Sequence, residues 1–171
     1  SLLLEAGVGD VVVCNQRGIL WHGEERAMSP MERWLAQQTN REGRTGNLAT
    51  ALRKADAFIG VAGYHALTAA MVQSMGPDAI VFALARPIID GNLTTLRWCT
   101  RIIATRETRY ANQLQTVLGF PGLFRGALDV RASRITSKML LAAAAALASV
   151  VSGDERSEQY IIPSTFSRAV V

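Results

Sequence analysis

The sequence predicts one α/β domain, built as a Rossmann-like parallel sheet with helices on both faces. Short apolar runs alternate along the chain with stretches patterned as helices, and such runs are typical of parallel strands buried on both faces. The chain has 171 residues, of which 49% are hydrophobic and 19% charged. This composition argues against disorder and suits a single domain with a sizeable core. We therefore expect residues 1–171 to form one domain.

The first predicted strand is the Val-rich run 11–13, which follows a helix end at residues 2–7. A polar residue, Asn15, comes just after this run and begins a turn that ends at Gly18. A helix end, a buried strand and a polar strand end occur in this order at the second strand of a dinucleotide-binding unit. The amide of Asn15 can hydrogen-bond a ribose hydroxyl, and Arg17 can accept a 2′-phosphate. Equally, Asn15 and Gly18 can form a turn and nothing more.

The middle of the chain continues the alternation of helices and strands, with helix N-cap residues at Ser29, Asn47 and Thr68. The predicted helices here are 30–38, 48–55, 69–75 and 93–99, and the predicted strands are 57–61, 79–85 and 101–105. Ligands of such sheets bind beyond the carboxyl ends of the strands. Those ends are Asn15, Ala62–Gly63, Arg86 and Arg106–Glu107.

The last part of the chain contains its most distinctive run. Two glycines bracket a Phe-Pro pair at 119–122, which predicts a sharp turn, and the apolar spacing that follows predicts a short helix over 123–131. Thr136 is the predicted N-cap of an Ala- and Leu-rich helix over 137–152. We expect the tail, 160–171, to pack back on the domain.

Composition and charge argue against several classes of protein. The net charge is +4, but the basic residues are mostly arginines scattered singly, whereas a nucleic-acid face needs a basic stripe with aromatic residues between. No apolar run reaches the roughly 18 residues of a membrane span, and the start of the chain lacks the pattern of a signal peptide. We therefore expect a cytoplasmic protein with free thiols at Cys14 and Cys99, binding neither nucleic acid nor membrane. His22 and His65 have no cluster of ligands at metal-binding spacing, so no metal site is expected from them.

Five runs of the chain occur in the same order as in a known family: 55–61, 79–85, 112–113, 117–132 and 160–163. Together they resemble the dinucleotide-binding domain of bacterial malic enzymes. The resemblance implies oxidative decarboxylation of malate to pyruvate with a nicotinamide cofactor and a divalent metal as the family reaction. It also implies a site for NAD or NADP at the strand ends, with Asn112 near the reacting end of the cofactor. The implied cofactor-binding residues are Asn15, Arg17, Ala62, Gly63, Ala85, Arg86 and Asn112.

The chain departs from the family pattern at several of these positions. The family has an aspartate where Asn15 stands, and asparagines that hold the substrate where Arg86 and Thr116 stand. Arg86 brings a long cation to the mouth of the site, and Thr116 is too short to replace a reaching amide. The family's first strand, glycine-rich turn, catalytic lysine and tyrosine, and acidic metal ligands have no counterpart in the chain. We therefore name no catalytic or metal-binding residue, and expect a divalent metal only if an amino-terminal half supplies the ligands.

Two functions follow from this pattern. In the first, the chain is the dinucleotide-binding domain of a malic-enzyme-like oxidoreductase and is inactive on malate by itself. In the alternative, it is a catalytically degenerate relative that serves as a binding or assembly module. The alternative predicts an exposed apolar patch where the first strand would have paired. The expected partners are a nicotinamide dinucleotide, an amino-terminal catalytic half or second chain, and another copy of the chain, since the family forms dimers.

Overall fold

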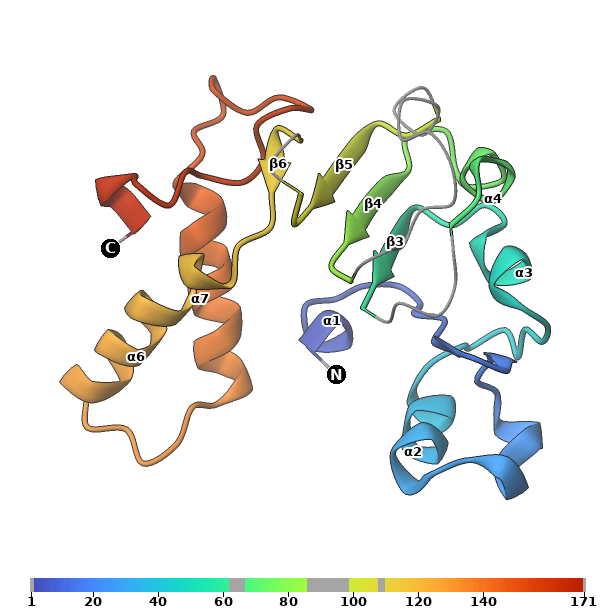
Figure 1. The fold of residues 1–171 in the computed structure, drawn as a ribbon. Helices are drawn as coiled ribbons and strands as arrows, with labels where there is room; N and C mark the ends of the chain where they lie inside the picture. Colours follow the sequence, from blue (N-terminus) through green and yellow to red (C-terminus); the bar gives the residue numbers. More distant parts are fainter. Residues whose placement is uncertain (1, 62–66, 86–98, 108–109, 171) are drawn as a thin grey trace. The chain divides into compact units, whose positions relative to one another are not determined.

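The computed structural model describes residues 2–61, 67–85, 99–107 and 110–170 (Figure 1). The chain comprises two compact units, Ser1–Arg101 and Ile102–Val171, and each contains both strands and helices. Most of the predicted helix over 93–99 lies outside the described residues.

The first unit begins with a short helix and a β-hairpin. Helix α1 (Leu2–Glu5) ends before Gly7, which has φ +89°, the left-handed conformation that glycine favours after a helix. This confirms the predicted helix end. Strand β1 (Cys14–Asn15) then pairs antiparallel with β2 (Gly18–Ile19).

The predicted parallel strand over 11–13 is wrong. Two carbonyls of this run accept hydrogen bonds from the N–H groups of Leu20 and Asn40, at 2.8 Å each, and the strand that forms lies at residues 14–15. The reason is the turn that follows, in which Gly18 takes φ +131° and returns the chain as a hairpin. The hairpin contact from Leu20 and the loop contact from Asn40 thus use the carbonyls that the apolar pattern predicts to pair in a parallel sheet.

Three helical segments follow the hairpin. The 3₁₀ segment η1 (His22–Ala27) leads to α2 (Pro30–Gln38), and α3 (Leu48–Leu52) comes after a polar loop. The predicted N-caps are confirmed, because the side chains of Ser29 and Asn47 accept hydrogen bonds from main-chain N–H groups in the first turns of α2 and α3.

A parallel strand pair completes the first unit. Strand β3 (Ala57–Gly60) is followed by α4 (Ala69–Gln73) and β4 (Ile80–Ala83), and β3 and β4 run parallel with Ala57 opposite Ile80 and Gly60 opposite Ala83. Helix α3 packs against α4 beside these strands (Figure 1). The buried apolar residues of this part are Leu48, Ala51, Leu52, Leu67, Val72, Met75, Ala79, Val81 and Ala83.

The second unit holds a second parallel pair and two helices. Strand β5 (Ile102–Thr105) pairs parallel with β6 (Asn112–Gln113). The 3₁₀ turn η2 (Thr116–Leu118) leads directly into α6 (Phe120–Asp129), which packs against α7 (Ser137–Ser149) (Figure 1). The parallel pair of β3 and β4, which is connected through α4, has the arrangement that defines the predicted α/β class.

Helix α6 begins three residues earlier than predicted. Pro121 lies in its first turn, where a proline has no hydrogen bond to lose, so Phe120 and Gly122 are helical and the predicted sharp turn is wrong. The N-cap predicted at Thr136 is confirmed at the start of α7. The described chain ends in the 3₁₀ turn η3 (Arg168–Val170). None of the helices in the described ranges is long and apolar enough to cross a membrane.

Candidate functional site

Asn15 lies at the end of β1, where the sequence predicts recognition of a ribose. Its side-chain Nδ2 donates a hydrogen bond to Oε1 of Glu32 at 2.7 Å, and its Oδ1 accepts one from the main-chain N–H of Arg17 at 2.8 Å. The second contact closes the turn that brings β2 back, so Asn15 does form the predicted turn. The first contact brings a carboxylate to the strand end, in place of the acidic residue that the chain lacks at position 15.

Glu32 belongs to α2 and is fixed by the start of that helix. Its Oε2 accepts a hydrogen bond from the N–H of Ser29 at 2.8 Å, and the N–H of Glu32 donates to Oγ of Ser29 at 3.3 Å, which together form a capping box. These contacts lower the pKa of Glu32 to about 2, with the Ser29 N–H as the main cause, the Asn15 amide next and the charge of Arg17 last. Glu32 therefore carries a negative charge at neutral pH.

Sequence reasoning missed Glu32 as a site residue. The spacing of Ser29 and Glu32 is the signature of a capping box, so the helix start was readable. The contact between Glu32 and Asn15 joins residues 17 positions apart, and no local pattern announces it.

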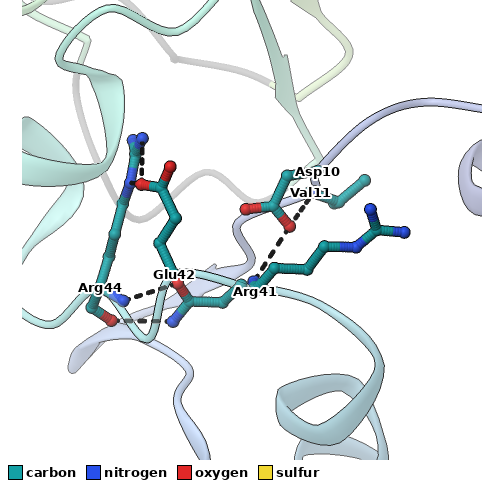
Figure 2. Close-up of polar contacts among 6 residues, drawn as sticks. Asp10, Val11, Arg41, Glu42 and Arg44 are labelled. Carbon is teal, nitrogen blue, oxygen red and sulfur yellow. Dashed lines mark hydrogen bonds and ion pairs between the residues drawn. The ribbon is translucent and has the colours of Figure 1, made fainter.

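The loop after α2 is tied to the segment before β1. Oδ1 of Asp10 accepts hydrogen bonds from the N–H groups of Val11 at 2.8 Å and of Arg41 at 3.2 Å (Figure 2). Within the loop, Arg44 donates through Nε to Glu42 at 2.8 Å, and the Arg44 N–H donates to Oδ1 of Asn40, also at 2.8 Å. The Asp10 contacts tie the loop after α2 to the chain that carries Asn15, and the contact between Glu32 and Asn15 ties the start of α2 to it.

Cys14 precedes Asn15 and belongs to the packing behind it. Burial raises the pKa of its thiol to about 11, so the thiol is neutral and poorly nucleophilic at neutral pH. Leu20, Met28 and Ala36 form a small buried cluster in the same part of the unit.

The carboxyl ends of β3 and β4 meet at Gly60. The carbonyl of Gly60 accepts hydrogen bonds from the N–H groups of Leu84 at 2.9 Å and of Ala85 at 3.2 Å. Ala85, a predicted cofactor-binding residue, therefore lies directly beside the end of β3. The neighbouring predicted site residues Ala62, Gly63 and Arg86 lie outside the described residues.

Asn112 lies in β6 and holds the tail of the chain. Its side chain is 2% exposed, its Nδ2 donates to the carbonyl of Glu158 at 2.9 Å and, more weakly, to that of Ile103 at 3.4 Å, and its Oδ1 accepts from the N–H of Ile161 at 2.9 Å. The prediction that the tail packs back is confirmed here, since Pro163 is also buried. The amide is thus engaged in structural hydrogen bonds, and its expected role near the cofactor stays a prediction.

Thr116, the substituted substrate position, is exposed at the start of η2. Within the part of the chain that the structure describes, no group of three or more His, Cys, Asp or Glu side chains is placed to hold a metal ion. Among the described residues, Asn15, Arg17 and Glu32 form a set of polar groups at the end of β1.

The groups at this strand end fit the adenosine ribose of a dinucleotide. An ionised carboxylate with a fixed orientation accepts hydrogen bonds from hydroxyl groups, and an arginine nearby offers a positive charge to phosphate. Glu32 supplies the first group and Arg17, which is exposed, supplies the second.

Comparisons with known proteins show which proteins this chain is similar to. Residues 99–168 match a family model described as malic enzyme, NAD binding domain. The chain is 41% identical to the bifunctional malic/malolactic enzyme of Bacillus subtilis, over 99% of this chain and 42% of that protein. It is 43% identical to the NAD-dependent malic enzyme of Geobacillus stearothermophilus, over 100% of this chain and 36% of that protein. The chain thus spans less than half the length of these relatives.

Solved structures show the same likeness in three dimensions. A crystal structure of malic enzyme from Pyrococcus horikoshii Ot3 matches 99% of this chain and 43% of its own, with a TM-score of 0.84 and 38% identity. A crystal structure of NAD-dependent malic enzyme from Thermotoga maritima matches 98% of this chain and 44% of its own, with a TM-score of 0.86 and 35% identity.

These matches define the class of protein as a Rossmann-like α/β domain with a parallel sheet, as the sequence predicts. The chain corresponds to the NAD(P)-binding domain of malic enzymes, which is the part of those proteins that it spans.

Proposed function

We propose that the chain binds NAD or NADP as the dinucleotide-binding domain of a malic-enzyme-like oxidoreductase. The observation that carries the proposal is the match to malic enzymes over nearly the whole chain, together with a polar strand end that suits a ribose. The cofactor, when bound, supplies hydride transfer chemistry. The chain contributes binding and orientation, through Asn15, Arg17, Ala62, Gly63, Ala85 and Arg86 at the strand ends and through Asn112 near the reacting end.

Within this proposal, Glu32 favours NAD over NADP. Its carboxylate is oriented by Ser29 and Asn15 and accepts a hydrogen bond from a ribose 2′-hydroxyl, as a strand-end acid does in many NAD-binding folds. The same charge repels a 2′-phosphate, and Arg17 only partly offsets that repulsion. The contact between Asn15 and Glu32 therefore supports a preference for NAD.

Calorimetric titration of the purified chain with NAD and with NADP tests the proposal directly. Binding of one or both at millimolar levels or below is the expected result. If neither gives heat at those levels, the chain does not bind the cofactor and the proposed function fails.

Glu32→Gln tests the cofactor preference. The variant keeps the size of the side chain and removes the charge, so the ratio of NAD affinity to NADP affinity is expected to fall about tenfold, the effect of one charge-assisted hydrogen bond. Glu5→Gln is the matched control, because Glu5 is exposed on α1. An unchanged ratio would show that Glu32 does not face the ribose. Asn15→Asp is a poorer test, because it sets a second carboxylate against Glu32.

We further propose that the chain does not turn over malate by itself. Arg86 and Thr116 replace the substrate-holding asparagines, and a divalent metal would need ligands from an amino-terminal half or a second chain. Joining the chain to the amino-terminal half of a relative, with Arg86→Asn and Thr116→Asn, should produce malate-dependent reduction of the cofactor. If this chimera binds cofactor and stays silent, the loss of activity lies deeper than these two positions. A cytoplasmic location is a proposal that rests on the composition of the chain, and a homo-oligomer is a proposal that rests on the family resemblance.

A second function, that of a binding or assembly module without chemistry, has one specific observation in its favour. Strand β3 exposes apolar side chains, with Ile59 at 43% and Val61 directly after it at 72%. Such exposure is expected where a partner covers the strand. Cofactor binding in the calorimeter favours the first function, whereas absence of binding leaves the module.

A further inference from the structure

Asn40, in the loop after α2, is a buried polar residue with a left-handed backbone. It is 4% exposed and has φ +56°, a conformation that residues other than glycine adopt rarely and asparagine more readily than most. Its side-chain Nδ2 donates to the carbonyls of Leu20 at 3.1 Å and of Arg44 at 2.8 Å, and its Oδ1 accepts from the N–H of Arg44 at 2.8 Å. The amide therefore uses both of its donor hydrogens and its acceptor within the folded chain.

The hydrogen bonds of Asn40 join the end of α2 to both arms of the β1–β2 hairpin. Its main-chain N–H donates to the carbonyl of Val11, in the segment before β1, at 2.8 Å, and its side chain donates to the carbonyl of Leu20, directly after β2. Thr39 closes the last turn of α2 by donating through Oγ1 to the carbonyl of Leu35 at 2.6 Å. Since Asn40 follows that turn directly, the carboxyl end of α2 is fixed on the hairpin.

The first turn of α2 carries Glu32, whose carboxylate accepts the hydrogen bond from Asn15 at 2.7 Å. This contact is only partly buried, and a hydrogen bond that water can replace contributes little to holding a helix in place. Ser29 fixes the carboxylate relative to α2 itself. The distance between Glu32 and Asn15 therefore depends on where α2 lies on the hairpin. The buried contacts of Asn40 determine that position from the other end of the helix, together with the apolar cluster of this part of the unit.

We propose that Asn40 is a positioning residue for dinucleotide recognition, acting through Glu32. Its hydrogen bonds to Val11 and Leu20 hold α2 on the hairpin in the position where the Glu32 carboxylate and the Asn15 amide meet. This role rests on the proposed function, in which Glu32 accepts a hydrogen bond from the ribose 2′-hydroxyl and disfavours a 2′-phosphate. Asn40, being buried, acts on the ribose by way of Glu32.

A positioning role and a role in stability alone predict different effects on cofactor choice. Glu32 discriminates at the 2′ position of the ribose, where NAD and NADP differ. Displacement of Glu32 therefore changes the ratio of NAD affinity to NADP affinity. Loss of stability without displacement of Glu32 lowers both affinities by the same factor, through the fraction of competent chain, and leaves the ratio unchanged.

Asn40→Gly is the variant that removes the side-chain contacts with least strain, because glycine adopts φ +56° freely. Lys54→Gly is the matched control, since Lys54 has φ +58° and is exposed beyond α3. Asn40→Asp is a second variant for the case in which Asn40→Gly does not fold. It keeps an acceptor for the N–H of Arg44 and removes the donors to both carbonyls.

NMR on the isotope-labelled chain without cofactor reports on the contact between Asn15 and Glu32. In Glu32→Gln, the signals of the Asn15 side-chain NH2 group are expected to move toward those of a free amide, because the variant lacks the charge that strengthens this hydrogen bond. Asn40→Gly is expected to move the same signals in the same direction. Lys54→Gly is expected to leave them in place.

Calorimetric titrations with NAD and with NADP then measure cofactor choice. In Asn40→Gly, the ratio of NAD affinity to NADP affinity is expected to fall about threefold or more, toward its value in Glu32→Gln. The double variant Asn40→Gly/Glu32→Gln is expected to show no further fall, because Asn40 acts through a carboxylate that is already absent. Lys54→Gly is expected to keep the ratio of the original chain.

Four results would overturn the proposal. The first is a folded Asn40 variant in which the Asn15 signals stay where they are in the original chain. The second is a fall in the ratio that adds in full to that of Glu32→Gln, so that Asn40 acts independently of the carboxylate. The third is a Lys54→Gly variant that reproduces both effects. The fourth is failure of both Asn40 variants to fold, which would assign the residue to stability alone.

The two measurements separate this role from the proposed function. If the original chain binds neither NAD nor NADP, the proposed function fails. The NMR comparison contains no dinucleotide, so it still decides whether Asn40 positions Glu32.

Discussion

Replacing Asn112 with alanine tests whether this residue is a structural clamp on the tail. The variant removes hydrogen bonds of 2.9 Å to the carbonyl of Glu158 and to the N–H of Ile161, both made by a side chain that is 2% exposed. A polar group left without a hydrogen bond away from water costs about 1–3 kcal/mol. For the two partner groups together this range doubles, but water can reach part of a loosened tail and reduces the cost. We therefore expect the free energy of unfolding to fall by about 2–4 kcal/mol.

Urea unfolding followed by circular dichroism measures this loss, and thermal unfolding should show a Tm lower by roughly 5–15 °C for a chain of this size. Amide exchange at Ile161 should accelerate at the same time, because its N–H has lost the Oδ1 acceptor. Gln115→Ala is the control, since Gln115 is exposed nearby and its side chain donates a hydrogen bond to the side chain of Gln113 at 3.3 Å. A loss below about 1 kcal/mol in Asn112→Ala, with unchanged exchange at Ile161, would refute the clamp.

Three further predictions concern the first unit. Contacts from Ser29 and Asn15 lower the pKa of Glu32 from 4.5 to about 2. The charge therefore stabilises the fold above pH 4.5, and this contribution disappears as the pH falls toward 2. The difference in Tm between the original chain and Glu32→Gln should be present at about pH 6 and shrink at about pH 3. Burial raises the pKa of the Cys14 thiol from 9.0 to about 11, which lowers its thiolate fraction about a hundredfold. A thiol reagent at about pH 8 should therefore modify Cys14 rapidly only after unfolding. Rapid modification of the folded chain that is lost in Cys14→Ala would contradict this. Gly18→Ala should lower the free energy of unfolding, measured with urea, by more than about 2 kcal/mol, because Gly18 has φ +131° and a Cβ there would lie 2.2 Å from the carbonyl oxygen of Gly46. Gly153→Ala is the control and should change that free energy little, since the space around Gly153 is open.

The sequence predicted the local features of the fold well. Ser29, Thr68 and Thr136 cap helices as expected, since an N-cap depends on groups within three residues of one another. The strands at β3, β4 and β5 also lie within their predicted ranges. Their apolar runs are bounded by turn residues, so pattern and structure agree.

The sequence showed the candidate site only in part, and the contacts that it did not show join distant residues. Asn15 was chosen correctly as a polar strand end, yet the carboxylate beside it comes from Glu32 on α2. Asn112 was assigned to the cofactor on resemblance, whereas its visible partners are Glu158 and Ile161, 46 and 49 positions away. Hydrogen bonds over such separations leave no periodic trace in the sequence.

The sequence by itself determined the α/β class, the starts of the helices with side-chain N-caps and the resemblance to malic enzymes, because these depend on apolar period, capping chemistry and ordered motifs. The tertiary structure decided how β1 pairs, which carboxylate faces Asn15 and which face of β3 is left open. Residues 11–13 illustrate the physical reason. Their valines favour any buried extended segment, but the choice of hydrogen-bond partner fell to the Gly18 turn and to Asn40, which the folded chain brings to them.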